Sequence, residues 1–350
     1  MPDQFLTLKD LAAREGTDDL VGLIEHVKIV APEIDVVPGR VISGIHYLAR
    51  VRTAIHASRA FRKVNAGVAL GASSYDQKRF NCYFFDAQMQ IDEAEAIAAE
   101  TQGDSMGKLM TEEAGGAMRA KAIYLGAQFY TGTTNDAEGP PGLVDFLVTQ
   151  GTVLDSRTGK AIDQVVTASG TAGSSITLED CWFAHVGPQG VHFLFGGGRG
   201  LVQNPWERQY VKDSNGKRFL AYLSNVSGYI GTSMADFHAV GVIKDIDTYT
   251  YAAGAFTYGL NDKLIAALWA KFPISLKPNV AFASQKVIAT LQNSRSVTLF
   301  GNLDEGTGPG GKRGDVAVVA PWPTNLPTAG GIPIIPTDSI AARSAVASLY

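Results

Sequence analysis

The spacing of apolar residues changes twice in the first 130 positions. Apolar residues at helical spacing predict two short helices within residues 1–30, and β-branched residues in alternation predict an extended arm over residues 41–57. Residues 80–85 are typical of a strand that returns toward this arm from a glycine-containing tip at residues 67–74. The two limbs predict a long hairpin. After Ile91 the pattern turns helical, and an apolar stripe with a period of 3.6 from Met106 to about Phe129 predicts the longest helix of the chain.

Glycine and proline divide the rest of the chain into short segments. Residues 131–142 form a loop by composition and mark a crossing between domains. Amphipathic spacing predicts helices at residues 262–272 and 285–295, the second with Ser284 as its N-cap. Alternating runs predict strands at residues 176–186, 191–195, 279–283, 316–320 and 332–335, with turns at 187–190 and 212–217. The pattern predicts a mixed α+β protein with mostly antiparallel strand pairing.

Composition restricts the class of protein. With 350 residues, 45% of them hydrophobic, the chain is long enough for one large or two modest domains with a sizeable core. No apolar run reaches the roughly 18 residues of a membrane-spanning helix. The first residues lack the pattern of a secretory signal, so we expect a cytoplasmic protein without a membrane partner. A net charge of −4 argues against a general nucleic-acid binder, so we expect any nucleic-acid contact to be local.

Charge divides residues 50–113 into two opposed halves. Residues 50–79 contain seven basic residues and one acid, and residues 86–113 contain eight acids and one lysine. The basic half coincides with the predicted hairpin and the acidic half with the predicted long helix, so the two are suited to pair between copies of the chain. The alternative is that both are solvated faces. The candidate interface residues are Arg59, Arg62, Lys63, Lys78 and Arg79 on the hairpin, and Glu93, Glu95, Glu112 and Glu113 on the helix.

The candidate motifs for catalysis, cofactors and metals lack the neighbouring residues or elements that such sites require. Residues 306–312 match a phosphate-binding loop, but Arg313 stands where a Ser or Thr would hold Mg²⁺, and a predicted strand follows instead of a helix. The six histidines lack metal-binding spacing, and no serine nucleophile motif is present. Cys82 and Cys181 both sit in apolar runs and are predicted to be buried free thiols. We therefore expect no catalytic residue, no cofactor and no metal ligand.

Several stretches, together with the order of the predicted elements, carry a family resemblance. They are Phe61–Gly67, Tyr75–Asp86, Gln90–Glu93, Gly126–Thr134, Gly139–Leu143, Ser174–Leu178, Gly187–Phe193 and Gly330–Asp338. The first three stretches are similar to an extended loop and its lead into a spine helix. The next two are similar to the end of that helix and the start of an axial domain. The following two are similar to the hairpin of that domain, and the last is similar to a final strand. By these stretches the chain resembles the major capsid proteins of tailed bacteriophages, which share the Hong Kong phage or Johnson fold.

The resemblance implies five segments. They are an N-terminal arm (1–50), an extended loop (51–90), a peripheral domain with the spine helix (91–135), an axial domain with excursions into the peripheral domain (136–315), and a return strand of the peripheral domain with the C-terminus (316–350).

The resemblance also implies a function. It is that of a structural protein, not an enzyme, which assembles in the host cytoplasm as hexamers and pentamers into the icosahedral capsid of a virion. The implied partners are other copies of the chain, double-stranded DNA packaged without sequence specificity, and scaffold, portal and decoration proteins. Bacterial encapsulins have the same fold and enclose cargo enzymes, so an encapsulin-type compartment is the alternative. An ATP-binding enzyme that uses the loop at residues 306–313 is the more distant alternative.

Overall fold

The fold was analysed in a computed structural model of the chain. It describes residues 31–54, 61, 63–67, 72, 74–101, 106–151, 161–169, 178–248, 251–252, 255–295, 328–329 and 331–340. Three predicted features lie outside these residues, namely the helices within residues 1–30, the strand at 316–320 and the loop at 306–313. The described part is α+β, as predicted, with two six-stranded sheets and two small two-stranded sheets. Nine of the twelve strand pairings are antiparallel.

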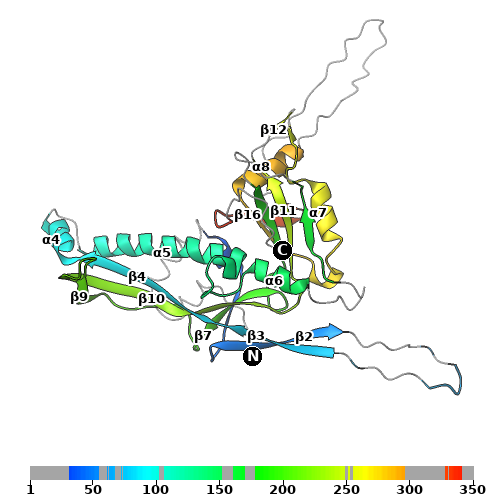
Figure 1. Cartoon of the computed structure of the whole chain (residues 1–350), viewed down its shortest axis with the longest axis horizontal. Helices are drawn as coiled ribbons and strands as arrows, with labels where there is room; N and C mark the ends of the chain where they lie inside the picture. The colour runs from blue at the N-terminus through cyan, green and yellow to red at the C-terminus, as the bar shows by residue number, and fades with distance from the viewer. Residues whose placement is uncertain are drawn as a thin grey trace, which may run out of the picture.

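The first large sheet lies along one long helix. Its main path is β1-β7-β10-β4, and β8 and β9 also pair with β10. The strands are β1 (Gly39–Val41), β4 (Tyr83–Asp92), β7 (Val191–Gly196), β8 (Val202–Gln203), β9 (Glu207–Lys212) and β10 (Arg218–Met234). Figure 1 shows the helix α5 (Met106–Thr131) running beside β4 and β10, with the short helix α4 (Glu93–Thr101) at their far end.

Alternation in β4 explains this packing. Ala87, Met89 and Ile91 are buried, whereas the residues between them are exposed, so one face of the strand is apolar. The helix α5 buries small residues and Met118 along one stripe, and small side chains let the helix approach the sheet closely. The prediction of a long helix is confirmed. Helical structure does begin just after Ile91, but in two elements, because α4 follows β4 directly and α5 is a separate helix that begins at Met106.

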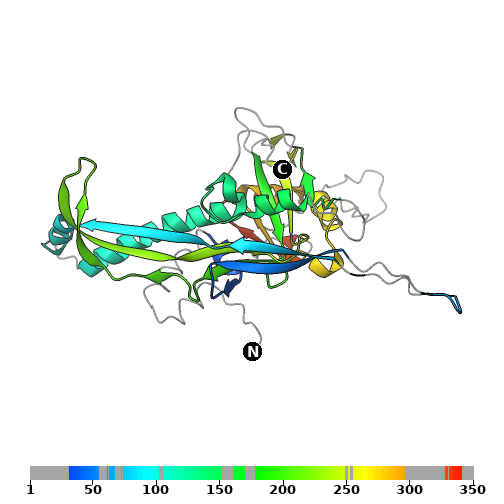
Figure 2. The same ribbon diagram turned by 60° about the horizontal axis from the view of Figure 1, so that its bottom comes forward.

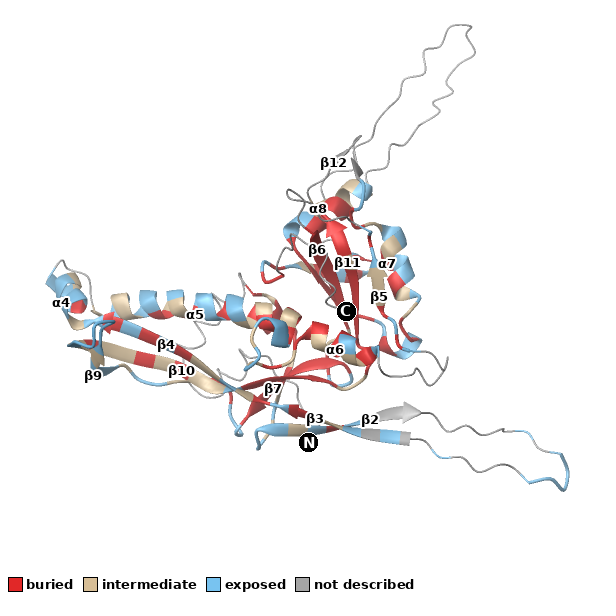
Figure 3. Ribbon diagram, in the orientation of Figure 1, coloured by how far each residue is buried: buried red, intermediate tan, exposed pale blue. Residues whose placement is uncertain are grey.

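The second large sheet forms a separate layer, in the order β15-β16-β14-β6-β11-β5. The strands are β5 (Val165–Thr167), β6 (Leu178–Ala184), β11 (Val240–Asp247), β14 (Val280–Ala283), β15 (Thr328–Ala329) and β16 (Ile332–Pro336). The helices α6 (Leu143–Gln150), α7 (Asp262–Trp269) and α8 (Gln285–Ser294) cover it. Every residue of the central strand β6 is buried, which Figure 3 shows as red ribbon.

The remaining elements are short. They are α3 (Glu33–Val36), η1 (Gly132–Thr134), η2 (Ile274–Leu276), and the pair β12 (Tyr251–Ala252) and β13 (Ala255–Phe256). The prediction about a helix start is confirmed. Ser284 caps α8, because its Oγ accepts a hydrogen bond from the backbone N–H of Val287 at 3.3 Å. Arg295 stands at the C-cap of the same helix and also binds Asp262 at the start of α7 through Nε at 2.9 Å.

The predicted hairpin at residues 176–195 is wrong. Its first limb, β6, pairs with β11 and β14, while its second limb, β7, pairs with β10 and β1 in the other sheet. The chain therefore changes sheets at the turn at residues 187–190. The turn at residues 212–217 does join a hairpin, formed by β9 and β10.

The predicted return of residues 332–335 to the domain of the long helix is not found for the strand itself. β16 pairs in parallel with β14, in the sheet covered by α7 and α8. The residues directly after it do reach the long helix, because Thr337 Oγ1 donates a hydrogen bond to Glu33 Oε2 at 2.9 Å and Ser339 lies against Gly126 of α5.

Aromatic side chains join the two sheets at the C-terminal end of α5. The ring of Phe129 lies 5.4 Å from that of Phe193 on β7 and 6.3 Å from that of Phe282 on β14. Its neighbour Tyr130 lies 6.2 Å from Trp182 on β6. Phe129, Tyr130, Trp182 and Phe282 are fully or almost fully buried, so this junction holds the long arm formed by α5, β4 and β10 against the second sheet.

Candidate assembly interface

The predicted basic hairpin is present and projects from the body of the subunit. It is formed by β2 (His46–Ala54) and β3 (Ser74–Asn81), which pair in antiparallel register with Tyr47 opposite Phe80. Figure 2 shows the two strands leaving the body on the side opposite to α4. The predicted strand at residues 80–85 is divided at Cys82, where the chain passes from β3 into β4, so its two halves belong to different sheets.

Alternation gives the base of the hairpin two distinct faces. Ala49 and Phe80 are buried, and the ring of Phe80 packs edge-on at 6.2 Å against Phe146 of α6. Lys78 belongs to this inner face, since its Nζ lies 4.0 Å from the ring centre of Phe237 in a cation–π contact. The base of the hairpin is therefore anchored to its own subunit.

The opposite face of the hairpin is exposed and basic. Leu48, Arg50, Gln77 and Arg79 lie on it, and the Arg50 guanidinium stacks 4.3 Å from the ring centre of Tyr75. Arg79 Nε donates a hydrogen bond to Asn81 Oδ1 at 3.0 Å. Two cations, one aromatic ring and the half-exposed Leu48 thus form a surface with the composition of a protein interface.

The tip of the hairpin carries large apolar side chains in water. Phe61 is 95% exposed and Val64 is 91% exposed, and both flank the exposed Lys63. A turn forms here, in which the backbone N–H of Ala66 donates to the Lys63 carbonyl at 3.1 Å. Sequence reasoning singled out the basic residues of this tip and did not single out the exposed Phe61 and Val64. Their signal was two large apolar residues inside a charged, glycine-containing turn.

The acidic candidates divide between two helices. Glu95 on α4 and Glu112 and Glu113 on α5 are exposed, and Glu112 lies 4.0 Å from Lys108. Glu93 has a partner within its own subunit, because its Oε1 lies 2.5 Å from the Nη2 of Arg208 on β9. Glu93 therefore helps to hold α4 against the β9–β10 hairpin.

One subunit cannot bring its own two charged surfaces together. Figure 1 shows α4 and the start of α5 at one end of the molecule and the β2–β3 hairpin directed toward the other end. Arg59 and Arg62 lie outside the described residues, and Lys63 and Arg79 are exposed on the hairpin. The structure thus places the predicted partners on separate surfaces of one chain, where they are accessible to other copies.

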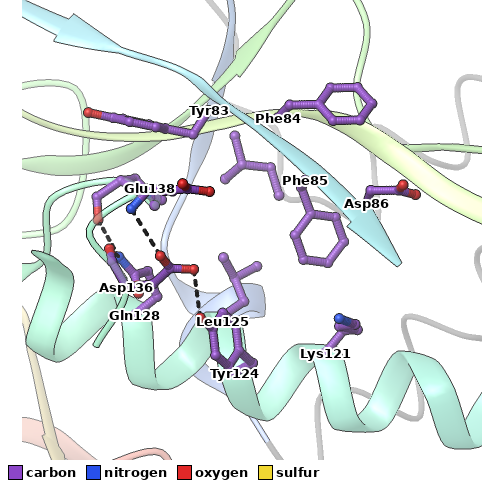
Figure 4. A pocket seen from close by; sticks show the side chains of 13 residues that line it. Tyr83, Phe84, Phe85, Asp86, Lys121, Tyr124, Leu125, Gln128, Asp136 and Glu138 are labelled. Atoms are coloured by element: carbon purple, nitrogen blue, oxygen red, sulfur yellow. Dashed lines mark hydrogen bonds between the residues drawn. The ribbon is translucent and has the colours of Figure 1, made fainter. Parts of the chain in front are cut away.

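A hollow of about 440 Å³ lies between β4 and α5 (Figure 4). Tyr83 and Phe85 reach it from the strand, and Tyr124 and Leu125 from the helix. Charged groups at its edge are Lys121, Asp136 and Glu138, while Asp86 on β4 also lines it. The Tyr124 hydroxyl donates to Asp136 Oδ2 at 2.7 Å, and the backbone N–H of Glu138 donates to Asp136 Oδ1 at 2.9 Å. These bonds, the Tyr124 hydroxyl first, lower the pKa of Asp136, so its carboxylate stays ionised.

Groups for other chemistry are not assembled in the part of the chain that the structure describes. Within these residues no three His, Cys, Asp or Glu side chains are grouped as a metal site requires. Cys82 and Cys181 are buried free thiols, as predicted, and burial raises the pKa of Cys82 to about 11. Among the described helices, none has the length and apolarity to cross a membrane.

A projecting hairpin with an exposed apolar tip, and opposed charges at the two ends of the molecule, are features expected of a subunit that associates with copies of itself. The family model described as "Major capsid protein GP7" matches residues 42–299, which is most of the chain. The chain belongs to this family of major capsid proteins. It is a structural protein that forms the icosahedral shell of a tailed bacteriophage, not an enzyme, and its place is the virion capsid.

The fold is shared with a solved structure, and other solved structures are less similar. A chain of bacteriophage Epsilon15 is 17% identical, with a TM-score of 0.55, and 88% of each chain is covered. A chain of the bacteriophage JBD30 capsid is 10% identical with a TM-score of 0.43, covering 75% of this chain and 81% of that one. The encapsulin of Synechococcus elongatus is 8% identical with a TM-score of 0.39, covering 62% and 88%. A comparison with curated protein sequences gave no match.

Proposed function

We propose that the shell formed by this protein is built from hexamers and pentamers, encloses double-stranded DNA and assembles in the host cytoplasm. The net charge of −4 supports contact with DNA that is local and independent of sequence, because tight phosphate binding requires a broad basic face. Scaffold, portal and decoration proteins are the proposed further partners, and no membrane takes part. Membership of the major capsid protein family supports this proposal over a compartment for cargo enzymes.

We further propose that the hairpin of one subunit pairs with the acidic helices of the next. The observation that carries this proposal is the position of the two surfaces at opposite ends of one subunit (Figure 1). Because the two surfaces differ, each subunit donates one and accepts the other, which is a head-to-tail contact. Contacts of this kind close into rings when the rotation between neighbours allows it. Hexamers and pentamers are closed rings of six and five subunits.

The candidate residues that the structure describes differ in their contacts within the subunit. Arg79 and Lys63, with Arg59 and Arg62 from the sequence, are the proposed donors, and Glu95, Glu112 and Glu113 are the proposed acceptors. Lys78 and Glu93 contribute less to the interface, because each is only partly exposed and contacts a residue more than 100 positions away in its own subunit. A single exposed ion pair contributes only about 0–1 kcal/mol, so the effect depends on repetition of the pair around the shell.

We propose a domain assignment that follows the sheets. The sheet along α5 is the peripheral domain, and the sheet covered by α7 and α8 is the axial domain. Residues 1–50 form the N-terminal arm, 51–90 include the extended loop, 91–135 contain the spine helix and 136–315 most of the axial domain. In residues 316–350, the strand β16 is assigned to the axial sheet and the segment after it to the contact with α5.

Charge reversal tests the proposed pairing. The Arg62→Glu, Lys63→Glu double variant is expected to reduce the yield of particles, because it adds acids to a hairpin that faces the acidic surface of the neighbouring copy, which includes Glu112 and Glu113. Adding Glu112→Lys and Glu113→Lys is expected to restore part of the yield. Yield is measured by sedimentation and negative-stain microscopy of the expressed chain. The matched control is Lys263→Glu with Lys277→Glu, which reverses two exposed lysines outside the hairpin. Unchanged yield and unchanged salt sensitivity in the hairpin variant would disprove the pairing.

A further inference from the structure

The tip of the hairpin exposes apolar surface that its own subunit does not cover. Phe61 and Val64 are 95% and 91% exposed, and among the residues whose burial is described the next most exposed large apolar one is Ile274, at 88%. Burial of large apolar side chains is the main favourable contribution to most protein association. A phenylalanine beside a lysine at the end of a long hairpin is therefore suited to insert into an apolar recess with an acidic edge.

The hollow between β4 and α5 is such a recess. Its walls are the side chains of Tyr83, Phe85, Tyr124 and Leu125, and its volume is about 440 Å³. Three carboxylates, Asp86, Asp136 and Glu138, line it together with one amine, Lys121 (Figure 4).

The acidic edge of the hollow is held in place before any partner arrives. Gln128 Nε2 donates to the backbone carbonyls of Asp136 and Pro140, at 3.1 Å and 2.9 Å. Asn135 Nδ2 donates to Gln128 Oε1 at 2.9 Å. A preformed recess loses little conformational entropy when it is filled, so it is well suited to binding.

We propose that the hairpin tip of one subunit inserts into this hollow on a neighbouring copy of the chain, with Phe61 between the aromatic walls and Lys63 toward Glu138. The inference rests on the proposed pairing of the hairpin with the acidic helices, and it identifies the recess that binds the tip of the hairpin. Phe61 supplies the apolar anchor, and Lys63 adds a positive charge to an edge with a net negative one.

The occupant is a second copy rather than the same chain. Figures 1 and 2 both show the hairpin leading away from α5, so a subunit's own tip lies far from its own hollow.

The lengths of the hairpin and of α5 agree with a hairpin that lies along the neighbour's helix. α5 has 26 residues and is about 39 Å long. The 16 residues from Lys63 to Arg79 span at most about 55 Å. The charged stem of the hairpin therefore reaches toward the neighbour's acidic helices when its tip fills the hollow.

Cross-linking in particles tests the location. The Phe61→Cys and Lys121→Cys variants are made as separate chains and assembled together, then treated with a short thiol cross-linker. The buried thiols Cys82 and Cys181 provide a low background, which unmodified particles measure. We expect covalent dimers from the mixture. The control mixture, Ile274→Cys with Lys121→Cys, places an equally exposed thiol elsewhere on the subunit and is expected to give none. Particles that form without dimers would overturn the inference, as would a cross-link found only within a chain carrying both substitutions.

Truncation of the anchor tests its contribution. Phe61→Ala is expected to lower particle yield by about tenfold or more at fixed protein concentration, because an aromatic anchor removed from a packed recess commonly has an effect of this size. Phe61→Leu is expected to retain most of the yield, and Ile274→Ala all of it. Wild-type yield from Phe61→Ala would overturn the anchor. That result is independent of the charge-reversal experiment, so failure of this inference and failure of the proposed pairing are distinguishable.

Discussion

Glu33 places a carboxyl group where three distant parts of the chain meet. The residue is fully buried between α3, the C-terminal end of α5 and the segment after β16, and Thr337 donates a hydrogen bond to it at 2.9 Å. Burial raises the pKa of Glu33, and the nearby charge of Asp338 acts in the same direction. The folded state therefore takes up a proton at a higher pH than the unfolded state does.

The raised pKa predicts a pH dependence of stability. The contribution of Glu33 is most favourable below its unfolded pKa of about 4.3 and is lost as pH rises through its higher folded pKa. Glu33→Gln keeps the shape and an acceptor for Thr337 but cannot ionise, so it is expected to unfold at a higher temperature than wild type at pH 8. The advantage should shrink toward pH 5. Thermal unfolding at both values measures it, with the exposed Glu95→Gln as control. An equal difference at both pH values would contradict the assignment.

Gly126 is a second residue whose role depends on this meeting point. A Cβ built on it meets the Glu33 carboxylate and the Ser339 hydroxyl within contact distance. Gly126→Ala is therefore expected to destabilise the subunit by about 1–3 kcal/mol, because neighbouring groups must shift in a packed interior. Urea denaturation measures the change in the free energy of unfolding. A stabilised variant would show that the contact between α5 and the segment after β16 is loose.

At the scale of elements, packing does not explain two adjacent glycines in the interior of α5. Gly115 and Gly116 lie within the helix, and a Cβ built on either finds no atom of the subunit within 4 Å. Alanine forms helix more readily than glycine, so Gly115→Ala with Gly116→Ala is expected to stabilise the unassembled subunit by about 1–2 kcal/mol in total. Urea denaturation measures the change in the free energy of unfolding. Gly126→Ala, measured in parallel, is expected to change it in the opposite direction. Destabilisation by the pair would indicate that the helix is strained at this point.

The elements themselves were largely predictable, because their signals are local. The hairpin limbs, the helices α5, α7 and α8, and the cap at Ser284 follow from alternation, helical period and turn residues. The helix α6 was missed because Leu143–Gln150 is a short, mostly apolar run whose period distinguishes neither helix nor strand. Its start is fixed by Asp145, which accepts hydrogen bonds from the backbone N–H groups of Thr133 and Gly142, both at 2.9 Å.

Pairing between strands and between charges was less predictable, because it depends on residues far apart in the sequence. Alternation marks β6 and β7 as strands but does not say that they enter different sheets. The charged halves of residues 50–113 identified the candidate surfaces. That Lys78 packs on Phe237 and Glu93 binds Arg208 depends on contacts across more than 100 positions, which a linear charge pattern does not contain.

At the scale of the whole molecule, the two proposed contributions to assembly respond differently to salt. Raising ionic strength from about 0.1 M to 1 M shortens the screening length from roughly 10 Å to 3 Å, which weakens exposed charge pairs and leaves apolar burial intact. The defect of the Arg62→Glu, Lys63→Glu variant comes from repulsion, so its particle yield relative to wild type is expected to rise in high salt. The defect of Phe61→Ala comes from lost apolar contact, so its relative yield is expected to stay low.

The different salt dependence of the two variants distinguishes the contribution of charge to assembly from that of the apolar tip. Both variants and wild type are assembled at matched concentrations across the salt series, and particles are separated from free subunits by sedimentation. Lys263→Glu with Lys277→Glu again serves as the charge control, and Ile274→Ala as the apolar one. If salt rescued both variants equally, the tip would act mainly through charge. If it rescued neither, the charge-reversal defect would have another cause than repulsion at the acidic helices. Rescue of the charge variant alone is the result that the geometry of the subunit predicts.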